Sequence, residues 1–217
     1  MVSARRTTKD VGSVPRRRYR SPYREQQAQQ TRAALLEAAT RLFTTRGWAA
    51  TGMRDIAGEA GVATETVYAH FASKTGLLQE VIDIAVVGDE ATVPLADRSQ
   101  FAALGQGSRA DRIAAAARLV ADVNTRTAGF AKVIRQAAPT DEEMAETLEA
   151  TRERQRRDVA AGLALLIGRR PTAAERDGIW ALMSHEVYLL LVESSGWNPE
   201  QYEAWMAETL DSVVPSE

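Results

Sequence analysis

Apolar residues recur along this chain with the period of an α-helix, and no stretch shows the strict alternation that is typical of a β-strand. The apolar stripe of the first helix consists of Leu35, Ala38, Ala39, Leu42 and Phe43. Ser21 and Pro22 supply an N-cap and a first-turn proline, so this helix is predicted to begin there or, alternatively, nearer Gln26. It is predicted to end at Gly47. The same periodicity continues to the end of the chain and predicts an all-α fold.

Residues 51–72 are predicted to form two short helices joined by a tight turn. The apolar positions of the first are Met53, Ile56, Ala57 and Ala60, a stripe that one helix face can bury. Gly61 follows at the turn, because glycine enters the left-handed backbone region without steric cost. The second helix runs from Thr64 to His70, buries Val67 and turns polar side chains outward. Such a helix suits the major groove of DNA.

Two segments resemble the TetR family of one-component transcriptional regulators. Residues 54–78, RDIAGEAGVATETVYAHFASKTGLL, are similar to that family's DNA-binding motif, and residues 31–46, TRAALLEAATRLFTTR, are similar to its first helix. The resemblance implies a helix-turn-helix domain, a divergent helical ligand-binding domain and a homodimer. The divergent part carries no comparable motif, so the identity of a ligand is not implied.

The resemblance also implies which residues would touch DNA. The residues at positions that face bases or the adjoining backbone are Thr64, Glu65, Thr66 and His70. Tyr68 and Lys74 match phosphate contacts, and Thr51 matches a helix N-terminus that faces a phosphate.

Three positions depart from the family pattern. Ala63 stands where a serine often caps the recognition helix, which removes a cap worth about 1 kcal/mol. Gly52 replaces a common threonine and removes a phosphate contact. Glu65 leaves two interpretations open: its carboxylate can accept a hydrogen bond from cytosine N4, or it can remain a solvated charge that disfavours nonspecific binding.

Charge is divided unevenly along the chain, although the net charge is only −2. Residues 1–80 hold 13 Lys and Arg against 7 Asp and Glu, whereas residues 81–217 hold 14 against 22. A basic N-terminal part indicates that this part meets a polyanion. Residues 1–21 are rich in arginine and lack a helical period, so a disordered basic arm is expected there. The arm either lies along DNA or is inert.

The remaining helices are predicted from capping motifs and turn residues. Ser73 begins a helix over 74–87, and the glycine-rich stretch 88–108 is predicted to be a loop with a short helix near 99–104. Further helices are predicted over 109–126, 128–137, 141–167, 173–195 and 199–213. The predicted organisation is a basic arm (1–21), a helix-turn-helix DNA-binding domain (22–72) and a helical ligand-binding and dimerisation domain (73–217).

The C-terminal helices carry candidates for a small-molecule site. Trp180, Ser184 and Tyr188 are spaced i, i+4, i+8 and are predicted to share one helix face beside His185. Other lining candidates are Phe101, Phe130 and Arg135. A mostly apolar cavity with a few polar groups is what such a site needs, although aromatic side chains at helical spacing also suit an ordinary core.

One segment of the same region predicts a subunit interface. Val187 to Val192, VYLLLV, is apolar all round the helix. A helix of this kind is buried on more than one side. We therefore expect one face to pack in its own chain and another against the partner of a homodimer.

Several functional classes lack the residues that they need. The chain has no cysteine, which excludes disulfides and cysteine-based zinc sites; neither a metal nor a cofactor is expected. Ser184, His185 and Glu186 are consecutive and point about 100° apart on a helix, so they cannot form a catalytic triad. The sequence contains no HExxH, P-loop or glycine-rich nucleotide motif. Neither a membrane span nor a secretory signal is expected, and the cytoplasm is the expected location.

These observations predict a DNA-binding transcriptional regulator. The leading hypothesis is a homodimeric repressor that leaves a pseudo-palindromic operator when a small-molecule effector binds. One alternative is an architectural DNA-binding protein or activator that takes no ligand, and another is a helical enzyme with a basic tail. A sizeable apolar cavity would favour the first over the second, and a footprint on promoter DNA would exclude the third.

Overall fold

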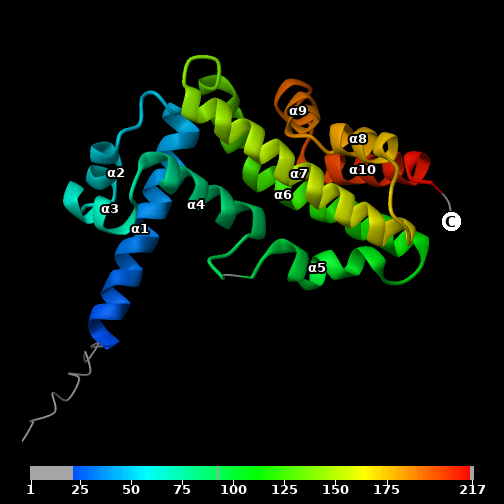
Figure 1. Cartoon of the computed structure of the whole chain (residues 1–217), viewed down its shortest axis with the longest axis horizontal. Helices are drawn as coiled ribbons and strands as arrows, with labels where there is room; N and C mark the ends of the chain where they lie inside the picture. Colours follow the sequence, from blue (N-terminus) through cyan, green and yellow to red (C-terminus); the bar gives the residue numbers. More distant parts are fainter. Residues whose placement is uncertain (1–21, 92, 216–217) are drawn as a thin grey trace, which may run out of the picture.

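The computed structural model describes residues 22–91 and 93–215, and every regular element in these ranges is a helix, which confirms the predicted all-α fold. The N-terminal helices are α1 (Pro22–Arg46), α2 (Met53–Glu59), α3 (Thr64–His70) and α4 (Lys74–Val87). The two short helices α2 and α3 lie together beside α1 at one end of the molecule (Figure 1). The predicted basic arm lies outside the described residues.

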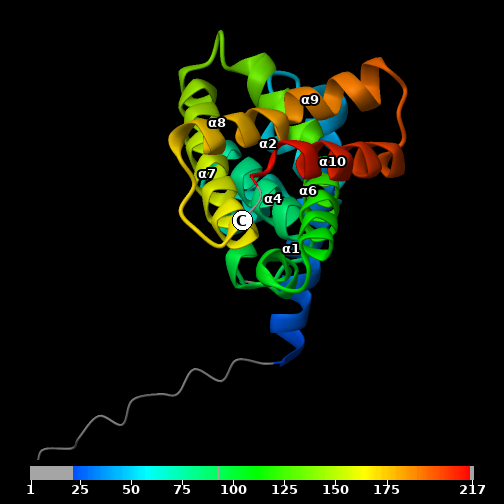
Figure 2. The same ribbon diagram turned by 90° about the vertical axis from the view of Figure 1, so that its right-hand side faces the viewer.

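The C-terminal helices are α5 (Ser99–Ala102), α6 (Arg109–Ala137), α7 (Glu142–Ile167), α8 (Ala173–Leu182), α9 (His185–Leu189) and α10 (Pro199–Val213). Single 3-10 turns, Leu95–Asp97 and Ala103–Gly105, flank α5. The long helices α6 and α7 run side by side through the molecule, with α8, α9 and α10 against them at the C-terminal end (Figures 1 and 2).

Two hydrophobic cores hold these helices together. The first combines apolar residues of α1 to α4 with Phe130, Ile134 and Met144 from α6 and α7. The second joins the α5 segment to α6, α7, α8, α9 and α10, with Tyr202 and Met206 fully buried. Because α6 and α7 contribute to the first core, the helix-turn-helix part is packed directly onto the C-terminal helices.

The structure corrects the prediction of separate helices over 109–126 and 128–137. They form the single helix α6, which continues through Gly129. A Cβ atom on Gly129 would lie 3.2 Å from Cγ2 of Thr44 in α1. This glycine therefore allows close approach between two helices and does not end one.

The predicted helix over 173–195 was also wrong, because the chain breaks after Leu182. Ser184 has an extended backbone (φ −65°, ψ 153°), and its hydroxyl accepts a hydrogen bond from the amide of Val187, so it caps α9. A π-helical turn, Leu190–Ser194, follows directly. Serine competes for backbone partners in this way, which is why it favours caps over helix interiors.

Several predicted helix ends are confirmed. Gly47 follows α1 with a φ of 80°, Ser73 caps α4 by accepting from the amide of Gly76, and Asn198 caps α10 ahead of a first-turn proline. The predicted helix over 141–167 begins one residue later than expected, because Asp141 is the N-cap of α7.

Candidate DNA-binding face and ligand cavity

The candidate recognition helix α3 is fixed by one buried residue and one glycine turn. Val67, on the inner face of α3, is fully buried. The amide of Phe71 donates to the carbonyl of Val67 and closes the helix. Gly61 has a φ of 68°, and the next amide, Val62, donates to the carbonyl of Ala57 at 3.0 Å. The turn therefore needs a residue that enters the left-handed region, as predicted.

The outer face of α3 presents the polar side chains that the sequence predicted. Tyr68 is 56% exposed, Glu65 is also exposed, and Thr64, Thr66 and His70 are half-buried. Ala63 occupies the N-cap position and makes no side-chain capping bond, as its lack of a hydroxyl requires. The geometry is that of a helix anchored on one side and open to a partner on the other.

The structure corrects the role predicted for Thr51. Its hydroxyl is buried and donates to the carbonyl oxygens of Gly47 at 2.8 Å and Leu42 at 3.2 Å. The N-cap of α2 is Gly52 instead, and the Gly52 amide donates to a carboxylate oxygen of Asp55. Thr51 closes the α1–α2 turn, so its side chain does not face a phosphate.

Lys74, the first residue of α4, lies against Trp48. Its Nζ is 3.8 Å from the centre of the indole ring and donates to the backbone carbonyl of Trp48. Burial lowers the pKa of Lys74, against the opposing effects of nearby acidic groups, of which Asp141 is the largest. The Trp48 Nε1 in turn donates to Asp141 Oδ2 at 2.7 Å. For Lys74 to bind a phosphate, its amine would have to leave this contact.

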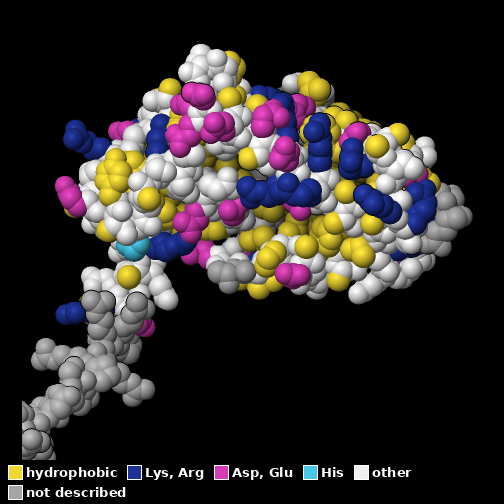
Figure 3. All heavy atoms as spheres, viewed as in Figure 1, with side chains coloured by type: hydrophobic (Ala, Val, Ile, Leu, Met, Phe, Trp, Pro, Cys, Tyr) yellow, Lys and Arg dark blue, Asp and Glu magenta, His cyan; other side chains and the backbone are white. Residues whose placement is uncertain are grey.

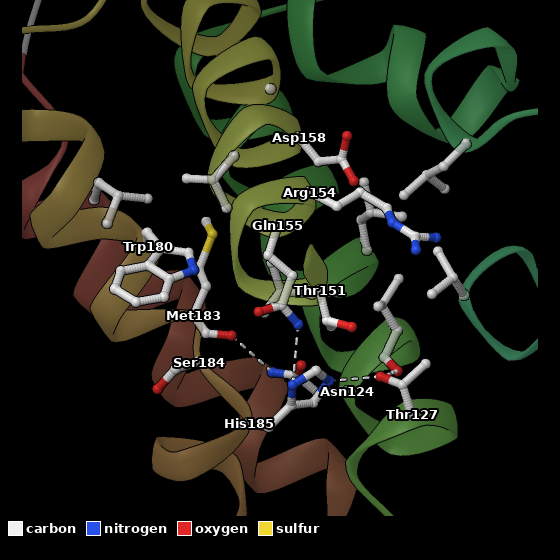
Figure 4. A pocket seen from close by; sticks show the side chains of 18 of the residues that line it. Asn124, Thr127, Thr151, Arg154, Gln155, Asp158, Trp180, Met183, Ser184 and His185 are labelled. Atoms are coloured by element: carbon white, nitrogen blue, oxygen red, sulfur yellow. Dashed lines mark hydrogen bonds between the residues drawn. The ribbon is translucent and has the colours of Figure 1, made fainter. Parts of the chain in front are cut away.

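A second candidate site is a cavity of about 170 Å³ between α4, the α5 segment, α6, α7 and α8. Apolar side chains dominate its wall, among them Ile82, Val86, Phe101, Leu119, Phe130, Leu163 and Ile179. Its polar residues are Asn124, Thr127, Thr151, Arg154, Gln155, Asp158, Ser184 and His185 (Figure 4). This combination of an apolar wall with a few polar groups is typical of a small-molecule site.

His185 is the centre of the polar end of the cavity and is only 8% exposed. The Thr127 hydroxyl donates to the Val123 carbonyl at 2.7 Å, so it accepts from His185 Nε2, which lies 2.7 Å away. His185 Nδ1 then accepts from the Gln155 amide nitrogen at 3.1 Å. These partners fix a neutral imidazole with its proton on Nε2. Burial lowers the pKa of His185 to about 4.

The depressed pKa of His185 predicts a loss of stability in acid. The unfolded chain binds a proton near the ordinary value of 6.5 and the folded chain only near 4. The contribution is therefore complete above pH 6.5 and lost as the pH falls toward 4, on the order of 3 kcal/mol in total. In urea unfolding, the free-energy difference between wild type and His185→Gln should shrink by about 2 kcal/mol from pH 7 to 4.5. Parallel pH profiles would show that His185 does not titrate in this window.

The structure brings five of the predicted ligand residues to the cavity. Phe101, Phe130, Trp180, Ser184 and His185 all line it. Tyr188 does not: its ring packs edge-on against Tyr202, with centroids 4.8 Å apart, and its hydroxyl donates to Thr125 Oγ1. The break before α9 explains the difference, because Trp180 and Tyr188 no longer belong to one helix. Arg135 lines a separate neighbouring pocket and pairs with Glu186 at 2.9 Å.

Sequence reasoning missed the polar residues that α6 and α7 contribute. Asn124 and Thr127 are buried at positions i and i+3 of α6, and Gln155 lies on α7. Two polar residues within an otherwise apolar helix face are the signal that could have found the first pair. Gln155 carries no such signal, because α7 is rich in polar residues around it.

The rim of the cavity is charged. Arg154 pairs with Asp83 of α4 at 2.6 Å. Asp158 is exposed as a whole residue, yet partial burial of its carboxyl group raises its pKa, against the opposing effects of Arg154 and Arg157. Charged side chains over α7 border a strip of hydrophobic side chains beside the α5 segment (Figure 3).

The described residues show neither a metal site nor a membrane-crossing helix. Over residues 22–91 and 93–215, the acidic and histidine side chains form no group of three or more that could hold a metal ion. Within the same ranges, no helix combines the length and the apolar character that a membrane crossing requires.

The fold and the two sites define a helix-turn-helix protein with a cavity in its C-terminal helices. The family profile of the bacterial regulatory proteins of the tetR family matches residues 35–81. The regulator TtgR of Pseudomonas putida is 46% identical over 59 residues, which cover 27% of this chain and 28% of TtgR. AcrR of Shigella flexneri is 38% identical over 61 residues, again 28% of each chain. These matches show that residues 35–81 belong to a DNA-binding domain of the TetR type, and the matched segment spans only about a quarter of the length of the relatives.

Solved structures resemble the whole fold at low sequence identity. NalD, the secondary repressor of the MexAB-OprM multidrug efflux pump in Pseudomonas aeruginosa, is 19% identical, with a TM-score of 0.64 over 87% of this chain and 98% of its own. A transcriptional regulator from Aquifex aeolicus is 14% identical, with a TM-score of 0.59 over 84% of this chain and 99% of its own. At these identities the similarity establishes the arrangement of helices.

Proposed function

We propose that this regulator represses transcription as a homodimer on a pseudo-palindromic operator and leaves it when a small molecule fills the cavity. The proposal rests on the position of helix α4 between the recognition helix and the cavity. The helix begins at Lys74, directly after α3, and its later residues Ile82 and Val86 line the cavity. A helix of this length spans about 21 Å. A ligand that moves α4 would therefore change the position of the recognition helix.

The mechanism requires two arrangements of the dimer. In one, the two α3 helices fit successive half-sites about one turn of DNA apart. In the other, the ligand-filled cavity favours a different position of α4 and a spacing that no longer fits. The ligand acts by binding the second arrangement more tightly, which is differential affinity between two states.

The cavity supports this proposal over the alternative of an activator or architectural protein without a ligand. We retain the domain boundaries at residues 22 and 72, a cytoplasmic location and the absence of a cofactor as parts of the proposal. The basic arm at residues 1–21 remains proposed as an additional DNA contact, since its arginines can neutralise phosphates.

The test is a footprint by the full-length protein on the DNA that flanks its own gene. We expect protection of a site with twofold symmetry, together with the mass of a dimer in light scattering. Protection of a single asymmetric site by a monomer, or no protection at all, would contradict the proposal.

The roles proposed for Tyr68 and His70 predict different effects on DNA binding when each is substituted. Tyr68→Phe removes only the hydroxyl proposed to bind a phosphate, so affinity should fall about tenfold on every sequence alike. His70→Ala should instead change the preferred base at one or two positions, because it is proposed to reach base edges. Binding to a library of single-base operator variants measures both. A His70→Ala profile parallel to wild type would remove His70 from base recognition.

A further inference from the structure

Trp180 offers the cavity a hydrogen-bond donor that nothing in the protein uses. Its Nε1 is buried and has no partner, although the residue lines the cavity. Figure 4 shows the nitrogen-bearing edge of the indole turned toward Met183 and Gln155. Buried polar groups are nearly always paired, and an indole nitrogen can only donate. An acceptor atom is therefore the group that this site lacks.

The imidazole and side-chain amide nitrogens at this end of the cavity are already paired. Both ring nitrogens of His185 are paired with Thr127 and Gln155. The Asn124 amide nitrogen donates to the Met183 carbonyl at 3.1 Å and to the Tyr202 hydroxyl at 3.0 Å. A ligand that competes for these groups would break existing hydrogen bonds. A ligand that accepts from Trp180 adds one and breaks none.

The charges around the cavity favour an uncharged ligand. An anion beside Trp180 would find Arg154 already paired with Asp83 and His185 neutral. Arg156, whose guanidinium carbon is 4.2 Å from the centre of the indole ring, is exposed and is not part of the cavity wall, so it gives a buried anion no ion-pair partner and it repels a cation. The carboxyl group of Asp158 lies with Arg154 at the other end of the cavity in Figure 4. Burying an unpaired charge is costly, so a neutral molecule fits this wall best.

The size of the cavity limits the size of its ligand. A volume of about 170 Å³ is close to the roughly 150 Å³ of an engineered apolar cavity that accepts benzene. One six-membered ring with a short substituent therefore fills it.

We propose that the effector is an uncharged, largely apolar molecule of about one ring that carries an acceptor oxygen, and that Trp180 Nε1 donates to this oxygen. The proposal rests on the proposed function in one respect, because it takes the cavity as the effector site. The chemistry of binding can nevertheless be measured without DNA.

The probes are four monocyclic molecules of similar size: acetophenone, ethylbenzene, benzoate and benzyltrimethylammonium. Acetophenone carries a carbonyl where ethylbenzene carries a methylene, so the two have similar size and only the first has an acceptor oxygen. One neutral hydrogen bond corresponds to a preference of about fivefold to tenfold for acetophenone, measured by calorimetric titration of the full-length protein. Trp180→Phe should lower acetophenone affinity to that of ethylbenzene and change ethylbenzene affinity less than about threefold.

The indole protons give a direct readout. The chain has four tryptophans, and the indole N–H signal missing from Trp180→Phe is that of Trp180. Acetophenone should shift this signal downfield, and ethylbenzene should not. Trp197→Phe is the matched control: Trp197 packs against Trp205, outside the cavity wall, and its loss should preserve the preference for acetophenone.

Four results would overturn the inference. Equal losses of both neutral probes in Trp180→Phe would show that the indole contributes packing and not a hydrogen bond. Tighter binding of benzoate would reveal a buried cation, and tighter binding of benzyltrimethylammonium would point to Asp158. Absence of binding by all four would exclude a one-ring ligand. If acetophenone binds as expected but leaves the operator complex intact, the ligand class stands and the proposed release mechanism fails.

Discussion

Leu190→Arg is expected to separate the proposed homodimer into monomers and to weaken operator binding at least a hundredfold. Leu190 is 61% exposed in the single chain, and it lies in the apolar run that the sequence predicts to be shared between two subunits. In a twofold interface each substitution appears twice, and each places an unpaired charge where an apolar contact was. Losing one of two linked half-site contacts costs about 10²-fold to 10⁴-fold in affinity.

Leu190 is chosen because it is exposed on the single chain, whereas the two residues before it in the apolar run are buried. Tyr188 and Leu189 are buried within their own chain, so Leu189→Arg, which the sequence alone suggests, would damage the subunit core. Leu190→Arg leaves that core intact. Light scattering should show a monomer with unchanged far-ultraviolet dichroism, and operator titration should show the loss of affinity.

Val93→Arg is the control for an exposed apolar residue elsewhere. Val93 is 45% exposed and lies in the loop after α4. This variant should remain a dimer with wild-type operator affinity. A dimer in both variants would place the subunit interface away from the π-helical turn.

Local signals explain which elements could be predicted. Gly47, Gly61 and Ser73 act within a few residues of themselves, so the boundaries of α1 to α4 follow from the sequence. The continuation of α6 through Gly129 could not be predicted, because the contact that favours this glycine is with Thr44 of α1. Sequence alone does not distinguish a glycine within a helix from one at its end.

The polar end of the cavity could not be predicted for the same reason. Thr127 and Gln155 reach His185 across sequence separations of 58 and 30 residues. Periodicity places each residue on a face of its own helix, but it does not say which faces meet. The aromatic candidates Phe101, Phe130 and Trp180 do line the cavity, because large apolar side chains face the interior of the protein.

Trp48 is the residue whose loss should cost the DNA-binding part most stability. It is 9% exposed and stacks on Phe43, with ring centroids 5.9 Å apart. Through Lys74 and Asp141 it also joins the starts of α4 and α7. Trp48→Ala removes the packing, the contact of the ring with the Lys74 amine and the hydrogen bond to Asp141, and it should lower the free energy of unfolding by about 3–5 kcal/mol.

Trp48→Phe separates packing from hydrogen bonding at this junction. The phenyl ring keeps the stack on Phe43 and a face for the Lys74 amine, but it cannot donate to Asp141. Urea unfolding followed by dichroism should therefore show a much smaller loss for Phe than for Ala. Equal losses would mean that the hydrogen bond to Asp141, and not the ring, holds the junction. In that case the start of α7, which leads into the cavity wall, would depend on a single polar contact with the DNA-binding part.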